Sequence, residues 1–352
     1  MSRQINNVNV RASPAGDAQV QHPAPVRSGL GLSHHPGRGR RKKRVQVRRL
    51  RIGSWNVGTM TGRGAELANI LQKRRINIAC LQETKWKGTK ARELSDGYKF
   101  FYCGKDGKRN GVGIVLDKDL KNNIIEINRV SDRIIYIRIL LGDLALTIMS
   151  VYAPQAGCDE RIKEKFWEEF DTTLMNVPSD DQLVIGGDFN GHVGKYNHDY
   201  ERVHGGKGFG SRNFEGECIL EMATAFDLAL VNTYFQKKDE HLITYKSGQH
   251  ATQIDYMLTR RSDIKKVKDC KVIPGEPLTS QHRLLVVELD IDLNRINYRQ
   301  KHVPKTKWWL LQNENFAADF KDRIVRKIRE VEFNENITVD DDWNVIANTI
   351  RE

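Results

Sequence analysis

The chain has 352 residues, of which 39% are hydrophobic, enough apolar material for one large core or two smaller ones. No window approaches the roughly 20 apolar residues that a membrane-spanning helix needs, and no apolar segment near the N-terminus resembles a secretory signal. The five cysteines are scattered without a closely spaced pair, which favours a reducing intracellular compartment over a disulfide framework or a zinc site.

The net charge of +12 is concentrated in the first part of the chain. Residues 1–51 carry 12 basic side chains and one acidic one, whereas the other 301 residues carry 45 basic and 44 acidic ones. The high isoelectric point is therefore no guide to what the body of the chain binds. Residues 1–48 are rich in Pro, Gly, Ser, Arg and His without a periodic apolar pattern, so we predict a disordered basic tail.

The tail contains a dense basic cluster, which consists of Arg38, Arg40, Arg41, Lys42, Lys43 and Arg44. Such a cluster is typical of a nuclear-import signal or of a segment that contacts phosphates, and equally of a solvated charge run. If it is an import signal, an import receptor is a partner and the protein is nuclear. Otherwise we expect a cytoplasmic protein.

Residues 49–293 have the pattern of one α/β domain. Apolar runs of strand length recur at residues 50–55, 76–81, 111–116, 134–140, 145–152, 182–186, 229–232, 253–258 and 284–289. Amphipathic helices are predicted at residues 65–73, 160–175 and 217–226. Because many strands follow one another directly, we predict two mixed, mainly antiparallel sheets that pack together, with helices on their outer faces.

Residues 294–352 are predicted to be a linker and a helical appendage. Phe316, Phe320, Ile324 and Ile328 repeat at helical spacing, which predicts a helix over residues 315–331.

Polar side chains follow several of the predicted strands. Asn56 ends the first strand, Gln82 and Glu83 end the second, and Asp188 follows two glycines that would let the backbone approach a ligand. Any one of these groups alone is more simply explained as a solvated strand end. Together with Asn190, Asp255 and His282 they supply oxygen ligands for Mg²⁺, a carboxylate that could activate water, and a His–Asp pair.

Six short motifs occur in the order of the endonuclease/exonuclease/phosphatase superfamily, which the chain resembles over residues 50–289. They are Ser54-Trp55-Asn56, Leu81-Gln82-Glu83-Thr84, Val151-Tyr152-Ala153-Pro154, Gly187-Asp188-Phe189-Asn190, Ile254-Asp255-Tyr256 and Ser280-Gln281-His282. The resemblance implies a four-layer, DNase-like sandwich of two sheets flanked by helices. It also implies a metal-dependent phosphodiesterase.

The resemblance implies a metal site at three residues. Glu83 resembles the principal ligand of Mg²⁺, for which Mn²⁺ is the alternative ion, and Asn56 resembles its neighbour. The family usually has Ser-Asp-His at the last motif, where this chain has Ser280-Gln281-His282, so Gln281 replaces the usual aspartate. A neutral amide oxygen can still bind the ion, but with one negative charge fewer the binding should weaken. Retrotransposon-type relatives commonly carry Gln at this position.

The resemblance also implies catalytic roles. Asp188 resembles the residue that orients or deprotonates the attacking water, and Asn190 the amide that holds a phosphate oxygen. Tyr152 matches a tyrosine near the scissile phosphate. His282 resembles the histidine that stabilises the transition state, with Asp255 fixing its tautomer and favouring its protonated form.

Four further segments are similar to the endonuclease domain of RTE-type LINE retrotransposons and to craniofacial development protein 2-like proteins. They are residues 56–60, 186–194, 231–235 and 281–285. The segment with Trp308 and Trp309 resembles the linker before a reverse transcriptase in such elements. The resemblance therefore implies a monomeric DNA-nicking endonuclease of retrotransposon origin, with DNA as its partner. Asn213, Tyr245 and Lys246 are candidate DNA contacts, since they fall in segments that could form loops around the groove.

Two other functions remain open at this point. The chain could be a catalytically weak DNA- or chromatin-binding module that retains the fold, which Gln281 favours. It could also be a phosphatase of small phosphoesters, because the superfamily fold does not determine the substrate.

Overall fold

The computed structural model describes residues 47–292 and 314–329. The predicted tail, apart from its last two residues, and the predicted linker lie outside the described residues, as does the basic cluster. The helix predicted in the appendage is present as α4 (Glu314–Arg329). Among the described residues, no helix is both long enough and apolar enough to cross a membrane.

The first sheet has seven strands, and its order mixes early and late segments of the chain. In spatial order they are β14 (Val267–Ile273), β15 (Leu284–Asp292), β1 (Val47–Asn56), β2 (Ile78–Gln82), β5 (Val112–Leu116), β4 (Lys99–Cys103) and β3 (Ala91–Glu93). The pair β1 and β2 is parallel and the other neighbours are antiparallel.

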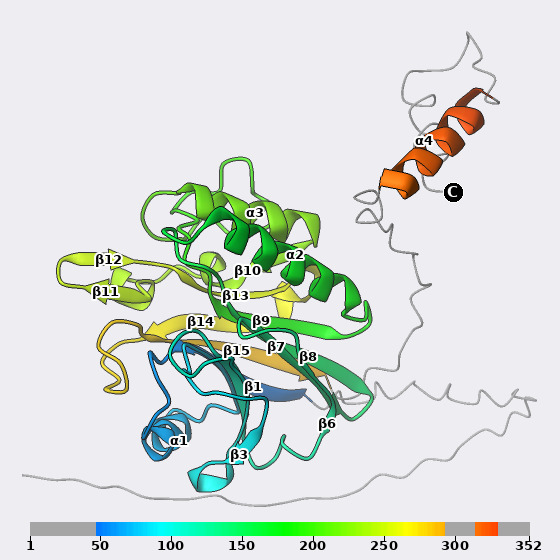
Figure 1. Ribbon diagram of the computed structural model, residues 1–352. Helices are drawn as coiled ribbons and strands as arrows, with labels where there is room; N and C mark the ends of the chain where they lie inside the picture. Colours follow the sequence, from blue (N-terminus) through cyan, green and yellow to red (C-terminus); the bar gives the residue numbers. More distant parts are fainter. Residues whose placement is uncertain (1–46, 293–313, 330–352) are drawn as a thin grey trace, which may run out of the picture. The chain divides into compact units, whose positions relative to one another are not determined.

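The second sheet has six strands and lies against the first (Figure 1). In spatial order they are β10 (Leu228–Leu230), β13 (Asp255–Arg260), β9 (Gln182–Asp188), β8 (Leu144–Tyr152), β7 (Ile134–Leu141) and β6 (Ile124–Arg129). A separate hairpin consists of β11 (Tyr245–Ser247) and β12 (His250–Thr252).

One helix covers the first sheet and two cover the second (Figure 1). They are α1 (Gly64–Lys73), α2 (Glu160–Asn176) and α3 (Phe214–Ala225). Short 3-10 turns occupy Ser95–Gly97, Val231–Tyr234, Asp239–His241 and Arg261–Lys266. The predicted four-layer sandwich of two mixed, mainly antiparallel sheets between helices is confirmed.

Three apolar clusters hold the layers together, and the strand period of two assigns residues to them. In β1, Leu50 and Ile52 lie in the cluster between the sheets, whereas Trp55 lies in the cluster under α1. In α2, Phe166 and Phe170 are one turn apart and pack on the second sheet. Alternation along strands and helical spacing thus explain why the sequence forms these layers.

Strand register brings polar strand ends to one edge of the sandwich. Asn56 at the end of β1 is level with Gln82 at the end of β2. In the second sheet, Asp188 at the end of β9 is level with Tyr152 of β8 and with Asp255, the first residue of β13. These polar strand ends therefore lie together at one edge of the sandwich.

Gly186 has a role that differs from the one predicted. A Cβ atom at this position would lie 3.1 Å from the Cβ atoms of both Cys80 and Ser54 on the facing sheet. The missing side chain therefore lets the two sheets approach each other beside the site, and the close approach is to protein and not to a ligand.

Candidate active site

Asn56 links two carboxylates across the two sheets. Its amide nitrogen donates to Glu83 Oε1 at 3.0 Å and to Asp188 Oδ2 at 2.9 Å, and its Oδ1 accepts from the backbone N–H of Gly58 at 3.0 Å. The side chain is fully buried. Asn56 therefore fixes the positions of Glu83 and Asp188 relative to each other.

Glu83 is surrounded by hydrogen-bond donors. Tyr152 donates its hydroxyl to Oε1 at 2.8 Å, and the Lys85 ammonium lies 3.2 Å from Oε2. Burial acts to raise the pKa of the Glu83 carboxyl, but the hydrogen bonds from Asn56, Tyr152 and Lys85 outweigh it and hold the pKa below its usual value. Glu83 is therefore an anion at neutral pH. The pKa of the Tyr152 hydroxyl is raised by burial and by the nearby carboxylates, so Tyr152 stays a donor.

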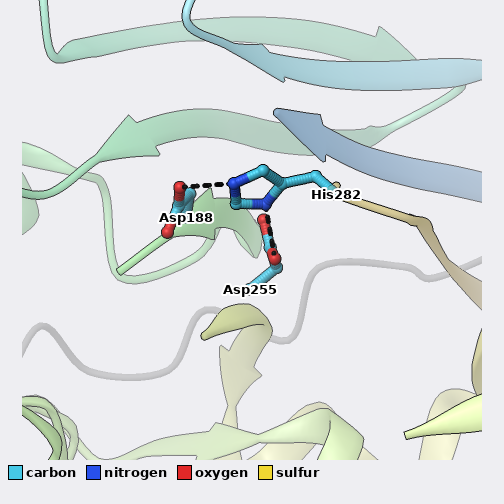
Figure 2. Close-up of side chains that lie close together, drawn as sticks. All are labelled: Asp188, Asp255 and His282. Atoms are coloured by element: carbon cyan, nitrogen blue, oxygen red, sulfur yellow. Dashed lines mark hydrogen bonds and ion pairs between the residues drawn. The ribbon is translucent and has the colours of Figure 1, made fainter. Parts of the chain in front are cut away.

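A second group consists of two aspartates on either side of one imidazole. Figure 2 shows Asp188 and Asp255 facing the two nitrogens of the His282 ring. His282 Nδ1 lies 3.1 Å from Asp255 Oδ2, and Nε2 lies 3.7 Å from Asp188 Oδ2. Asp255 and Asp188 are both buried, and the other oxygen of Asp255 has no hydrogen-bond partner among the described residues.

The pKa values in this aspartate–histidine group are strongly shifted. Burial raises the pKa of Asp188 to about 7, with a further contribution from the Asp255 charge and opposition from His282. Burial lowers the pKa of His282, but the charge and hydrogen bond of Asp255 outweigh this and raise it to about 9. At neutral pH the imidazole is therefore protonated, while Asp188 is close to its titration point.

Asn190 adjoins Asp188 and adopts the left-handed backbone conformation, with a φ of 49°. Its backbone N–H donates to Asp188 Oδ1 at 3.1 Å, and its side-chain amide donates to the Ala153 carbonyl at 2.9 Å. Glu83 also has a positive φ, of 51°. A positive φ strains the backbone of a residue other than glycine and persists only where surrounding contacts hold it. Such residues are frequent at functional sites.

Three further predicted site residues lie on the β11–β12 hairpin or directly before His282. The Gln281 side chain is exposed, and its amide donates to Ser247 of β11 at 3.3 Å. Tyr245 contacts the His282 ring edge-on at 4.8 Å, while Lys246 is exposed and its backbone N–H donates to the Gln281 carbonyl. The hairpin therefore supports the His282 loop, and metal binding by Gln281 stays a prediction.

Asn213 caps a helix. Its Oδ1 accepts from the backbone N–H groups of Gly216 in α3 and His192, at 2.9 and 2.8 Å, and its amide nitrogen donates to Glu215. The hydrogen bonds are those of a residue that positions the segment after Asn190. A direct DNA contact of Asn213 stays a prediction.

Three residues without a predicted role also support the site. Thr244 accepts hydrogen bonds from the backbone N–H groups of Ile254 and Asp255, both at 3.0 Å. Asn232 donates to the Asp255 carbonyl at 2.9 Å, and Lys85 pairs with Glu83. Asn232 falls in one of the family-like segments, and Lys85 follows the Glu83 motif directly. Thr244 gives no signal without the fold.

The donor set fits a hard cation at Glu83 better than at the aspartate–histidine group. Ligand atoms of Asp188, Asp255 and His282 lie within 4.8 Å of one another, but the imidazole is protonated and has a carboxylate at each nitrogen. The Glu83 side chain is 19% exposed, against 2% for Asp188 and 0% for Asp255. Mg²⁺ commonly binds one or two carboxylates and keeps several waters, so Glu83 could be its main protein ligand. Asn56 directs its amide nitrogen to Glu83 and its Oδ1 to the Gly58 N–H, so the amide would have to turn its oxygen toward the ion to bind it.

Comparison with known proteins gives the family. The pattern of the Endonuclease/Exonuclease/phosphatase family matches residues 53–282, which include every site residue from Asn56 to His282. The chain belongs to this family. Craniofacial development protein 2 from Bos taurus is 32% identical over 286 residues, which cover 80% of this chain and 47% of the relative. The chain thus spans about half the length of that relative.

Two further similarities extend the comparison. An uncharacterised 149 kDa protein of transposon TX1 from Xenopus laevis is 21% identical over 203 residues, covering 55% of this chain and 14% of that protein. The structure of a 3' phosphatase, NExo from Neisseria, bound to product DNA hairpin has a TM-score of 0.54 and 18% identity. It covers 69% of this chain and 100% of that chain, and it shows the fold that the two share.

Proposed function

We propose that the chain is a Mg²⁺-dependent phosphodiesterase that nicks DNA. The observation that carries this proposal is the pairing of two groups across the sheets by Asn56. One is the anionic Glu83 with its donors, and the other is the buried Asp188–His282–Asp255 group. A phosphodiester is itself negative, so its hydrolysis needs a positioned base and donors for the charge that develops on the phosphate oxygens.

Each side chain has a role that its surroundings support. Asp188, with a pKa near neutrality, accepts a proton from the attacking water. Protonated His282 donates to a phosphate oxygen, and Asp255 holds its tautomer through Nδ1. Asn190 contacts Asp188 through its backbone N–H, and Tyr152 contacts Glu83 through its hydroxyl. Mg²⁺ held by Glu83 and Asn56, or Mn²⁺ in its place, would supply positive charge opposite the phosphate.

DNA is the proposed substrate for two reasons. The chain belongs to a family of nucleases and phosphatases, and one relative is a transposon protein. The retrotransposon origin rests on the same relative and on the motif resemblance. The basic cluster at residues 38–44 is a further candidate contact with phosphates or with an import receptor, and nuclear localisation stays a prediction that depends on it.

A supercoiled-plasmid nicking assay tests the proposal. The full chain with Mg²⁺ should convert supercoiled plasmid to the open circular form, and Asp188→Ala and His282→Ala should abolish the conversion. Equal residual nicking by all three proteins would show that a contaminant cuts the plasmid and would contradict the proposal.

The assay also separates the two alternatives. Salt-dependent DNA binding without nicking in either Mg²⁺ or Mn²⁺ would favour a binding module. The exposure of the Gln281 side chain and its hydrogen bond to Ser247 are the observations that favour this alternative. Phosphate release from small phosphoesters without nicking would favour the phosphatase.

A further inference from the structure

A cavity of about 700 Å³ opens beside the proposed site, and Glu83 and Tyr152 are among the residues that line it. Its walls are the loop between β4 and β5 and the first half of α2. Seven lysine and arginine side chains and three carboxylates line it. Because the rest of the body is close to neutral, this excess of positive charge is a local feature.

The loop wall carries three cations on a turn with a defined conformation. Lys105, Lys108 and Arg109 are exposed and line the cavity. Asp106 Oδ1 accepts hydrogen bonds from the backbone N–H groups of Lys108 and Arg109, at 2.8 and 3.0 Å. Asp132, in the connection between β6 and β7, pairs with Lys105 at 3.6 Å and accepts a hydrogen bond from the Asn110 amide at 3.0 Å. These two contacts hold the turn against that connection.

The helix wall carries Arg161 and Lys165, which are four residues apart and so lie on one face of α2. Both are exposed, and Lys165 has only a distant partner, Glu169, at 3.9 Å. Within the part of the chain that the structure describes, Lys108, Arg109 and Arg161 form no ion pair. These cations are therefore available to an anion from outside the chain.

Arg133 connects the cavity to the site. Its guanidinium donates to the Tyr152 carbonyl at 3.1 Å and lies 5.2 Å from the centre of the Tyr152 ring. Tyr152 in turn donates to Glu83. A strand whose phosphate reacts at Glu83 and Asp188 would therefore meet Arg133 first and the two cationic walls next.

We infer that this cavity binds the phosphate backbone of a nucleic-acid strand. The part bound there is the stretch next to the reacting phosphate, on the side of Glu83 and Tyr152. The inference rests on the proposed function and deepens it, because cations spread over two walls suit several linked phosphates. A small phosphoester would occupy the site and leave both walls without a partner. The walls thus favour a polymeric substrate over a free phosphoester.

Salt-dependent binding by the full chain tests the inference. The probe is a short fluorescein-labelled DNA duplex in EDTA, followed by anisotropy over a KCl series, so that binding is measured without cleavage. The variants are Arg161→Gln with Lys165→Gln and Lys108→Gln with Arg109→Gln. The matched control is Lys118→Gln with Lys265→Gln, two exposed lysines that follow β5 and β13, strands that begin at the site and run away from it.

Each lost phosphate contact reduces the slope of log K against log salt by about 0.9. Each cavity variant should therefore bind more weakly, with a slope shallower by about 1 to 2, while the control keeps the wild-type slope. Slopes of the cavity variants equal to that of the control would overturn the inference.

Hydrolysis of bis(p-nitrophenyl) phosphate separates the inference from the proposed function. The only phosphate of this small diester is the one that reacts, so it offers the wall cations no further phosphate to bind. The cavity variants should therefore hydrolyse it at the wild-type rate, and an equal loss on the diester and on DNA binding would overturn the inference. If wild-type protein nicks no plasmid but the slopes change as expected, the proposed function fails and the cavity assignment stands.

Discussion

Glu83 and Asp188 are carboxylates joined by one amide, that of Asn56, yet their surroundings push their pKa values in opposite directions. Glu83 is partly exposed and accepts from Asn56, Tyr152 and Lys85, which outweigh burial and lower its pKa. Asp188 is fully buried beside Asp255, and its pKa rises to about 7. Two carboxylates with diverging pKa values are suited to different tasks.

These opposite surroundings suit the two carboxylates to different tasks. A group that stays anionic and faces solvent suits a hard cation, whereas a buried group near its titration point can accept and release a proton at neutral pH. The positive charge of His282 acts on Asp188, because Asp188 and Asp255 face the two nitrogens of its ring. Replacing each carboxylate by its amide, in Asp188→Asn and Glu83→Gln, should therefore affect nicking in different ways.

The largest effect is expected from Asp188→Asn. The amide keeps the size of the side chain but cannot accept the proton of water, so the nicking rate should fall by about 100- to 10,000-fold. Added Mg²⁺ should not restore it. Thermal unfolding of the variant serves as the folding control, and a rate within a few-fold of wild type would remove Asp188 from the role of base.

A smaller and reversible effect is expected from Glu83→Gln. Loss of one negative charge should raise the Mg²⁺ concentration needed for half-maximal nicking. Changing a residue that only supports a metal ligand lowers metal affinity by roughly 10- to 100-fold, so the loss of a ligand should cost at least as much. Activity should then recover in part at high Mg²⁺. A Mg²⁺ titration of the nicking rate measures this, and a loss that no Mg²⁺ concentration alleviates would count against the ligand role.

The smallest effect at low pH is expected from Asp255→Asn, which acts through His282. A protonated imidazole is needed as donor, so kcat/KM in the wild type should fall as pH rises through about 9. Without the Asp255 charge the His282 pKa should return toward or below its ordinary value of about 6.5. The alkaline fall in the pH profile should therefore shift to lower pH, and an unshifted profile would argue against this coupling.

Much of the site follows from local sequence. An apolar run that ends in Asn56, Glu83 or Asp188 predicts a buried strand with a polar end, and the register of the sheets then brings these ends together. The strand predicted at residues 229–232 is only partly confirmed, because β10 ends at Leu230 and a 3-10 turn follows. The short, fully exposed β3 was missed, since its polar residues have no apolar alternation.

Other features depend on contacts between distant segments and could not be predicted. The walls of the cavity join a loop near residue 108 to a helix near residue 161, two polar segments without a motif. The Gln281 amide bonds to Ser247 because the hairpin lies beside it, which sequence spacing does not indicate. The sequence predicts a loop at Asn213 and a helix from residue 217, whereas α3 begins at Phe214. An asparagine directly before the true start is a typical helix cap.

Direct metal binding tests the division of roles most directly. Mn²⁺ titrations followed by electron paramagnetic resonance would compare wild type with Glu83→Gln, Asp188→Asn and Gln281→Ala in the absence of substrate. Glu83→Gln should weaken Mn²⁺ binding strongly, and the other two variants should bind the ion nearly as the wild type does. Weakening by Asp188→Asn or Gln281→Ala as great as that by Glu83→Gln would contradict the account.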